Sequence, residues 1–242
     1  MTVTPQDKVA WEVTEALGRL MFFTEPELDQ EDVVLEVACW TGLVARAIGR
    51  RVRHVTAIDA SPAMLEEGKR RADRDGITNV TFARGDAADL PYLDRSFTLT
   101  VTRFSLHHFS DPLGALREMV RVSRPGAGLI VADIVRPEGP GDPDAIERLR
   151  DPSHAALLTA DEIAGLLTEA GAEVKRREPF EVLRPVDQWL EQSRTPPDAA
   201  ERIRAELRAE LAGGPPTGLR PEIADGELSF THSHAFLAAT AS

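Results

Sequence analysis

The sequence predicts an α/β fold in which a mostly parallel sheet carries helices on both faces. Apolar runs of strand length alternate along the chain with amphipathic segments at helical spacing. Strands separated by helices form right-handed βαβ units and a largely parallel sheet. The 242 residues, of which 42% are hydrophobic, suffice for a single larger domain over 1–242 with a sizeable core.

The first half of the chain shows this alternation clearly. We expect, in order, a helix over 6–21, a strand over 32–39, a helix over 41–50, a strand over 55–60 and a helix from Ser61 to Gly76. The strand over 32–39 is a short apolar run, as expected of a strand buried on both faces. Ser61 followed by Pro62 predicts a helix start, because serine favours the N-cap and proline the first helical position.

The second half continues the pattern. We expect strands over 80–83, 97–103 and 128–135, a helix that starts at Asp111 and ends before 124–126, a helix from Thr159 to Gly171, and final strands over 173–182 and 228–239. Asp111 with Pro112 repeats the cap-plus-proline signal. Thr159 with Glu162 three residues later is a capping box.

Residues 186–226 interrupt the alternation between the last two strands. A helix over 186–192 and a charged helix over 198–211 are expected there, and a Gly-Gly-Pro-Pro stretch at 213–216 ends the second one. An insertion of this size predicts a helical lid rather than a second domain. Residues 1–30 would form an N-terminal helical cover, and 33–136 a ligand-binding core.

Composition excludes several classes of function. There are 28 Lys and Arg against 40 Asp and Glu, so the net charge is −12. A chain this acidic is unsuited to neutralising the phosphates of a nucleic acid. Cys39 is the only cysteine, which excludes an intrachain disulfide and a cysteine zinc cage. No apolar run approaches about 20 residues and no basic leader is evident, so we expect no membrane segment and a cytoplasmic protein.

Acidic and small residues follow successive strands at the edge where open parallel sheets bind ligands. Glu36 begins a turn of mostly small residues that leads into a helix, and Asp59 follows 23 residues later at the end of the second strand. Asp86 follows the third strand. A carboxylate at the Asp59 position can accept hydrogen bonds from ribose hydroxyls. Each carboxylate taken alone favours a solvated or capping residue, but together they indicate a nucleoside site.

The chain resembles a known family at this point. The residues that carry the resemblance are 34–39 with 41–42, 59–65, 85–87 with 90–91, 103–109 with 111–112, and 121–122 with 124–126. They resemble the class I S-adenosylmethionine-dependent methyltransferases, in the small-molecule branch related to ubiquinone/menaquinone C-methyltransferases. The resemblance covers about 33–136 and extends weakly to the C-terminus.

The resemblance implies a Rossmann-like, doubly wound seven-stranded sheet of order 3-2-1-4-5-7-6 with one antiparallel strand. It implies S-adenosyl-L-methionine as cofactor and S-adenosyl-L-homocysteine as product. It also implies roles for site residues: Glu36 for the methionine amino group, Ala38, Cys39 and Trp40 for the methionine portion, Asp59 for the ribose, Ala60 and Met64 beside the adenine, Asp86 and Ala87 at its N6 and N1, and Arg103 beside the sulfonium.

Trp40 departs from the family pattern, which has glycine at this loop position. Glycine allows close backbone approach and positive φ. The indole is expected either to point away, with a negative φ, or to lie across the methionine pocket. Because a buried tryptophan removes about 150–250 Å² from water, we expect this side chain to need a large space.

Histidines are the candidate catalytic residues. His107 and His108 follow the fourth strand and could act as general base, since histidine titrates near neutral pH, or they could simply pack the loop. His154 reads as structural. His232 and His234 alternate on one strand face, but no third ligand is evident, so no metal is expected.

Three functions follow from these residues. The first is methyl transfer to a small metabolic or natural-product acceptor. The second is a non-methylating reaction on the same scaffold, such as cyclisation or rearrangement, with cofactor binding altered or lost because of Trp40. The third is a non-catalytic binding protein, which is weaker because the strand-end carboxylates are intact.

Overall fold

The computed structural model describes residues 18–21, 23–24 and 28–242. The strands are β1 (Val33–Val37), β2 (His54–Asp59), β3 (Val80–Arg84), β4 (Phe97–Arg103), β5 (Ser123–Ile134), β6 (Ala172–Pro185), β7 (Pro221–Ala224) and β8 (Glu227–Ala241). The helices are α2 (Leu43–Gly49), α3 (Pro62–Arg74), η2 (Leu106–His108), α4 (Pro112–Val122), α5 (Pro143–Arg150), α6 (Ala160–Glu169), α7 (Val186–Gln192) and α8 (Pro197–Leu211). Most of the predicted helix over 6–21 lies outside the described residues.

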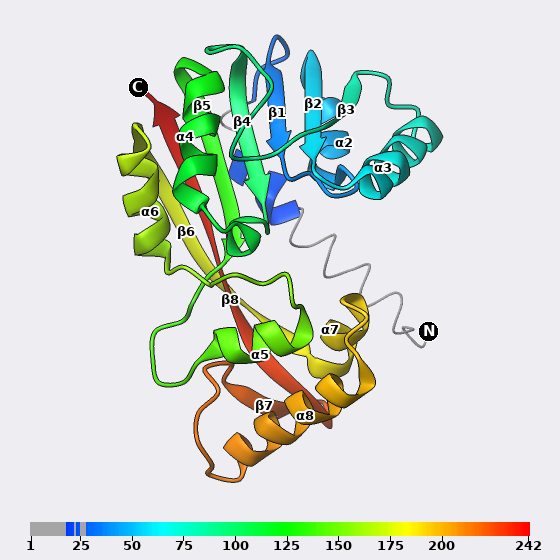
Figure 1. Cartoon of the computed structure of the whole chain (residues 1–242), viewed down its shortest axis with the longest axis vertical. Coiled ribbons are helices and arrows are strands. Elements are labelled where there is room, and N and C mark those ends of the chain that lie inside the picture. The colour runs from blue at the N-terminus through cyan, green and yellow to red at the C-terminus, as the bar shows by residue number, and fades with distance from the viewer. Residues whose placement is uncertain (1–17, 22, 25–27) are drawn as a thin grey trace.

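One twisted sheet organises the molecule (Figure 1). Its strand order is β3-β2-β1-β4-β5-β8-β6, and β7 pairs with β8 as a short eighth strand. The pairs from β3 to β5 are parallel, whereas β8 runs antiparallel to both β5 and β6. The α/β class and the strand order are therefore confirmed, and the sheet has eight strands instead of seven.

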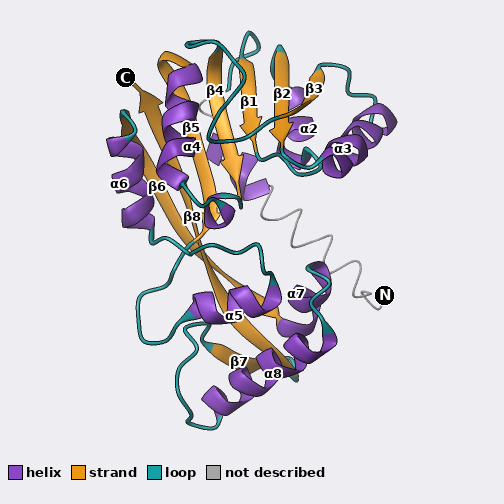
Figure 2. Cartoon of the chain, viewed as in Figure 1, coloured by secondary structure: helices purple, strands orange, loops and turns teal. Residues whose placement is uncertain are grey.

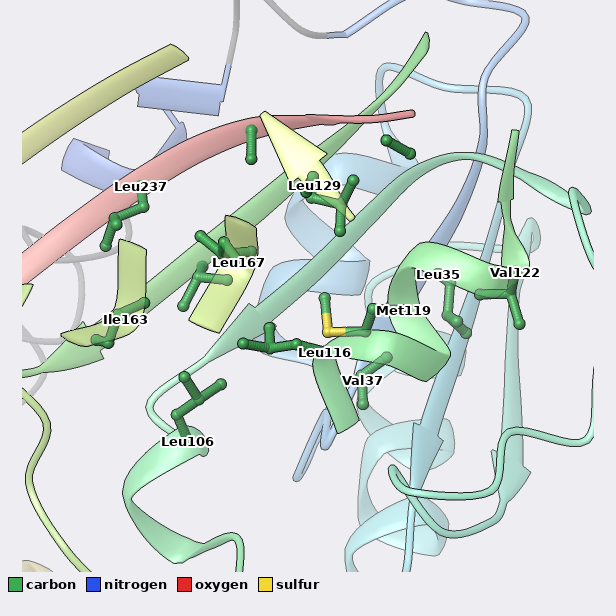
Figure 3. Close-up of a cluster of buried hydrophobic side chains, with 14 of the residues drawn as sticks. Leu35, Val37, Leu106, Leu116, Met119, Val122, Leu129, Ile163, Leu167 and Leu237 are labelled. Atoms are coloured by element: carbon green, nitrogen blue, oxygen red, sulfur yellow. The ribbon is translucent and has the colours of Figure 1, made fainter. Parts of the chain in front are cut away.

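Two hydrophobic cores cover the two faces of this sheet. Side chains of α4 and α6, such as Leu116, Met119 and Leu167, pack on one face against β4, β5 and β8 (Figure 3). On the other face α2, Leu20 and Phe23 pack against the sheet, with Phe23 against Phe236 at 5.6 Å between ring centroids. Ala235, Leu237, Ala239 and Ala241 of β8 belong to the first core, and Phe236 and Ala238 belong to the second.

A second group of elements surrounds the ends of β6 and β8 that extend beyond the parallel sheet (Figures 1 and 2). We name α5, α7, α8 and β7 the cap. It has its own apolar cluster, centred on Trp189, Ile203 and Phe230. Residues 186–226 supply α7, α8 and β7, and α5 joins them from a different part of the chain. No helix was predicted at 143–150, although Asp142 caps it through the amide of Ala145 at 3.3 Å and Pro143 follows it.

Local signals at other helix ends have mixed outcomes. Thr159 and Glu162 form the predicted capping box, with both reciprocal hydrogen bonds present. Asp111 accepts a hydrogen bond from the amide of Gly114 at 2.8 Å, as its cap position predicts. Ser61 is at the N-cap of α3 but its side chain makes no capping bond. Among the described residues, no helix is both long and apolar enough to span a bilayer.

Candidate functional site

A cavity of about 640 Å³ lies where the parallel strands end and the cap begins. One half is lined by residues at or just after the ends of β1, β2 and β4, among them Glu36, Ala38, Cys39, Trp40, Asp59 and Arg103. The other half is lined by the cap-side ends of β6 and β8, by η2, and by the ends of α5 and α7. The cavity therefore joins the predicted ligand edge of the sheet to the cap.

The turn between β1 and α2 has left-handed backbone at three positions. Ala38, Trp40 and Gly42 have φ of 55°, 50° and 65°. At Gly42 a Cβ atom would come within 2.5 Å of the Phe82 ring, so this position needs glycine for space as well as conformation. The expectation of a negative φ for Trp40 is wrong. The indole is 63% exposed, so the expected large burial space is also absent, and the side chain lies at the rim of the cavity.

Glu36 is a buried carboxylate at the end of β1. Its Oε2 accepts a hydrogen bond from the amide of Ala45 at 2.7 Å. Burial raises the pKa of Glu36 to about 8, although that amide and the nearby Arg103 oppose the shift. Burial also lowers the pKa of Arg103 to about 10, and the charge of Glu36 opposes that shift. A cationic group placed near Glu36 would favour its ionised form.

Asp59 ends β2 beside the turn. Its two oxygens accept hydrogen bonds from the amides of Trp40, at 2.7 Å, and Ser61, at 2.8 Å. A carboxylate offers about four lone-pair sites, so two remain for a ligand. Asp59 is half-buried on the cavity wall, where a ligand can reach those sites.

His107 on η2 faces Asp133 at the end of β5. The distance from His107 Nδ1 to Asp133 Oδ1 is 2.5 Å, and both side chains are buried. Burial alone would lower the pKa of His107, but the charge and hydrogen bond of Asp133 exceed that effect and raise it. The amides of His107 and Ile134 also bond to Asp133, which holds the carboxylate in place.

His108 and His154 have different surroundings. His108 lines the cavity, and its Nδ1 lies 3.2 Å from the carbonyl oxygen of Ser153. Burial and the neighbouring His107 lower the pKa of His108. His154 is buried outside the cavity wall, with Nε2 at 2.6 Å from Asp144. His154 therefore contributes to the packing of the loop after α5.

Comparison with known proteins shows which family this chain belongs to. Residues 34–126 match a methyltransferase domain family. The uncharacterized methyltransferase YcgJ of Bacillus subtilis (strain 168) is 30% identical over 205 residues, covering 84% of this chain and 80% of the relative. The chain belongs to the class I S-adenosylmethionine-dependent methyltransferases. The crystal structure of the YcgJ protein from Bacillus subtilis has a TM-score of 0.82 to this methyltransferase at 25% identity, covering 94% of this chain and 98% of that one.

A second relative covers less of the methyltransferase. The demethylmenaquinone methyltransferase of Listeria welshimeri is 37% identical over 112 residues, which cover 45% of this chain and 47% of that protein. The resemblance to this branch of the family is thereby confirmed for the cofactor-binding part of the chain.

The residues at the β1 and β2 ends of the methyltransferase fit its cofactor, S-adenosylmethionine. The cofactor carries positive charge and a ribose diol. Glu36 supplies a buried carboxylate whose raised pKa reflects the lack of a sufficient nearby positive charge, and Asp59 retains lone pairs for two hydroxyl donors. The two carboxylates are thus chemically matched to the ammonium group and the ribose hydroxyls of S-adenosylmethionine.

Four residues predicted to contact the adenine lie outside the cavity wall. They are Ala60, Met64, Asp86 and Ala87. Ala60 and Asp86 are exposed, while Met64 and Ala87 are half-buried. The Asp86 carboxylate accepts a hydrogen bond from the amide of Ala88 at 2.9 Å. Their contact with adenine stays a prediction.

Several residues of the site were missed or underrated from sequence. Asp133, which bonds to His107 but does not itself line the cavity, was read only as part of an apolar strand. Phe104, Phe180 and Arg150 were not singled out, and His232 and His234 were considered only as metal ligands, yet all five line the cavity. A polar residue at the end of a buried strand, as at Asp133, is the signal that could have been used. Among the described residues, no group of three or more His, Cys, Asp or Glu side chains could hold a metal ion.

Proposed function

We propose that this methyltransferase transfers the methyl group of S-adenosylmethionine to a small-molecule acceptor, with His107 as general base. The observation that carries the proposal is the buried pair of His107 Nδ1 and Asp133 Oδ1, 2.5 Å apart, on the wall of the cavity that also contains Glu36 and Asp59. A base held by a carboxylate next to a cofactor site is suited to deprotonating an acceptor.

Cofactor binding falls to the residues at the ends of β1, β2 and β4. Glu36 and Asp59 would bind the ammonium group and the ribose hydroxyls, and the backbone of 38–40 would surround the methionine portion. Arg103 lies close enough to Glu36 to influence its pKa. Bound S-adenosylmethionine supplies a methyl group already activated on a sulfonium. The protein therefore needs to orient the acceptor and exclude water, without a nucleophile of its own.

His107 would receive the acceptor proton at Nε2. Its Nδ1 donates to Asp133, which fixes the tautomer and leaves the Nε2 lone pair for the cavity. The raised pKa makes the neutral imidazole a stronger base than an isolated histidine. Methyl transfer to a hydroxyl releases one proton for each methyl group, and His107 holds that proton until it passes to solvent.

The cap would enclose the acceptor half of the cavity. Residues from α5 and α7, including Arg150 and Gln192, line this half together with β6 and β8. We therefore assign residues 186–226 and α5 jointly to the lid. The alternative of a non-methylating reaction depended on an indole that obstructs the methionine pocket, and the 63% exposed side chain of Trp40 does not favour it.

Calorimetric titration with S-adenosylhomocysteine tests cofactor binding. We expect micromolar affinity for the wild type and a loss of about tenfold or more for Asp59→Asn, because an amide binds the ribose diol less well. Asp86→Asn measures separately whether the predicted contact with the adenine contributes to binding. No binding by the wild-type protein would reject the methyl-transfer proposal.

The pH dependence of methyl transfer tests the base. The rate should rise with pH as His107 loses its proton, with an apparent pKa above the usual 6.5 of histidine. Asp133→Asn removes the group that raises this pKa. The pH at which the rate reaches half its maximum should therefore fall, and the maximum rate should fall by about tenfold or more. An unchanged pH–rate profile in Asp133→Asn, together with unchanged turnover in His107→Ala, would rule out His107 as the general base.

A further inference from the structure

The side chain of Trp40 is held at the rim of the cavity by its own backbone. Its amide donates to Asp59 Oδ2 at 2.7 Å. The amide of Cys39 donates to the carbonyl oxygen of Ile58 at 2.9 Å, and that of Gly42 donates to the carbonyl oxygen of Cys39 at 2.7 Å. These bonds fix the direction of the Cα–Cβ bond of Trp40, so the indole is presented to the cavity. Strained backbone of this kind is typical of positions that hold a ligand.

The indole of Trp40 lacks partners within the described part of the chain. None of the aromatic rings and cationic side chains described there stacks on it. With 63% of the residue exposed, most of its apolar surface also stays in water. A large ring that lines a cavity without packing against the protein is suited to packing against a ligand.

The phenylalanine rings of the cavity wall are more fully engaged. The guanidinium group of Arg103 lies over Phe104, 4.1 Å from the ring centroid. That of Arg19 lies over Phe180, 5.3 Å from the ring centroid. Phe109 packs against the core around α4 and α6. All three phenylalanines are half-buried, so the indole is the ring with the most surface left for a ligand among those the structure describes on this wall.

Anionic side chains of the cofactor half are already assigned. Asp59 accepts two amide hydrogen bonds, and its other lone pairs belong to the ribose in the proposed function. Glu36 is assigned there to the ammonium group. Burial and the charges of these two carboxyl groups raise the pKa of the Cys39 thiol, so that sulfur stays neutral. Among the described residues of this half, no further anionic side chain is left for the positive charge on the cofactor's sulfur, and Arg103 adds positive charge.

A sulfonium differs from an ammonium group in how a protein can recognise it. It carries a positive charge but no N–H or O–H bond, so it donates no conventional hydrogen bond. An aromatic face attracts such a cation through its quadrupole, and tryptophan does so most strongly. The sulfur joins the amino-acid part of the cofactor to the ribose. The turn that presents Trp40 lies between Glu36 and Asp59, the residues assigned to those two parts.

We propose that the Trp40 indole makes a cation–π contact with the sulfonium of S-adenosylmethionine and thereby selects the charged cofactor over its neutral product. The inference rests on the proposed function. In methyl transfer to a hydroxyl, the methyl group passes to the acceptor oxygen, the proton of that oxygen passes to His107, and the sulfur keeps the electron pair of the broken bond. The sulfur is then neutral and the cation–π attraction ends, which favours release of S-adenosylhomocysteine. The glycine of the family pattern could not make this contact.

Calorimetric titration of the full-length protein tests this preference without turnover. The ligands are S-adenosylmethionine, S-adenosylhomocysteine and sinefungin, in which a charged amino group on carbon replaces the methylated sulfur. The measured quantity is the ratio of the Kd of S-adenosylhomocysteine to the Kd of each charged ligand. A ratio cancels any effect of a substitution on the parts that the three ligands share.

Two variants separate the ring from its bulk. Trp40→Leu and Trp40→Phe both keep a Cβ atom, so both retain the cost of the positive φ. Trp40→Leu should lower both ratios about fivefold, and Trp40→Phe should lower them less than about twofold, because a phenyl face still attracts a cation. Phe180→Leu makes the same aromatic-to-leucine change on β6, in the other half of the cavity, and should leave both ratios unchanged.

Unchanged ratios in Trp40→Leu would overturn the proposal, and so would an equal fall in Trp40→Leu and Trp40→Phe. Trp40→Gln also keeps the Cβ atom and lacks a ring, so it provides a second measurement if the leucine variant does not fold. Failure of the proposed function would appear differently, as the absence of S-adenosylhomocysteine binding to the wild-type protein. Binding of S-adenosylhomocysteine with ratios that do not respond to Trp40 would reject the role of the indole alone.

Discussion

Trp40 occupies a backbone position that L-amino acids rarely adopt. Its φ of 50° places it in the left-handed region, at a cost of about 1–2 kcal/mol for a residue with a Cβ atom. The amide of Trp40 donates to Asp59, so the turn needs this conformation to hold the carboxylate. With 63% of the side chain exposed, packing offsets little of the cost. A strained residue at a cavity rim suggests a contribution to ligand binding.

Comparing Trp40→Gly with Trp40→Ala isolates this strain. We expect the glycine variant to be more stable than the alanine variant by about 1 kcal/mol in urea unfolding, because alanine retains the penalty for positive φ and glycine does not. Ala212→Gly, at a position with φ of −84°, is the control and should be destabilised. A glycine variant less stable than the alanine variant would contradict the argument.

At the scale of elements, α5 connects the cap to β8 through a buried charge cluster. Glu147 on α5 is fully buried, with Oε2 at 2.9 Å from Arg150 Nε and Oε1 at 3.3 Å from His232 Nε2. Arg150 in turn lies over the ring of Trp189 on α7, 4.8 Å from its centroid. Glu147 thus binds Arg150 within α5, Arg150 contacts α7, and the carboxylate lies against His232 of β8 without a hydrogen bond to it.

Glu147→Gln should therefore destabilise the protein by about 3 kcal/mol, because it leaves the buried charge of Arg150 without its partner. We expect affinity for S-adenosylhomocysteine to change little, since the cluster lies on the acceptor side. Glu206→Gln removes an exposed pair with Arg202 on α8 and should cost less than about 1 kcal/mol. Chemical unfolding measures both variants, and equal losses would contradict the proposed importance of the cluster.

The molecule as a whole combines buried groups whose pKa values shift in opposite directions. Burial lowers the pKa of His232 to about 4 and that of His234 well below its usual value. Below pH 6.5 the unfolded chain binds these protons first, so stability falls as the pH drops. The pKa of Glu36, raised to about 8, has the reverse effect: above pH 4.5 the unfolded chain releases its proton first, so stability falls as the pH rises toward 8.

Because the two histidines outweigh the single carboxyl group below pH 6.5, the free energy of unfolding should be greatest near that pH. His107 reinforces the alkaline decline, since its raised pKa contributes stability that is lost at higher pH. Glu36→Gln should reduce the loss of stability between pH 6.5 and pH 8 by about 2 kcal/mol, and His234→Phe should reduce the loss below pH 6.5. Urea unfolding at a series of pH values provides the measurement. Stability that continues to rise from pH 7 to 8 in the wild type would disprove this account.

Local periodicity predicted the strands around the cofactor half of the site with little error. Strand β4 matches its predicted bounds, and Glu36 and Asp59 lie at strand ends as expected, because short apolar runs and acidic residues after them are local signals. The acceptor half depends on residues far apart in the chain, such as His107 and Asp133 or His108 and Ser153. Sequence periodicity reports only on neighbouring residues, so it cannot predict contacts between residues this far apart in the chain. Trp40 also has a positive φ where a negative one was expected. The turn requires this conformation for the amide of Trp40 to reach Asp59, although a residue with a Cβ atom favours negative φ.

Strand β8 continues from the cap into the core without a break, and this has a consequence for insertions and deletions. Its even-numbered residues include His232 and His234 at the cavity and then Phe236 and Ala238 in one core, while Leu237 and Ala239 face the other. Since side chains alternate along a strand, losing a single residue would reverse the faces on one side of the change. Changes of length in β8 are tolerable only in steps of two. Evolution of the acceptor site on this strand is therefore restricted to substitutions and to changes of two residues at a time, whereas the loops of the cap remain free to vary in length.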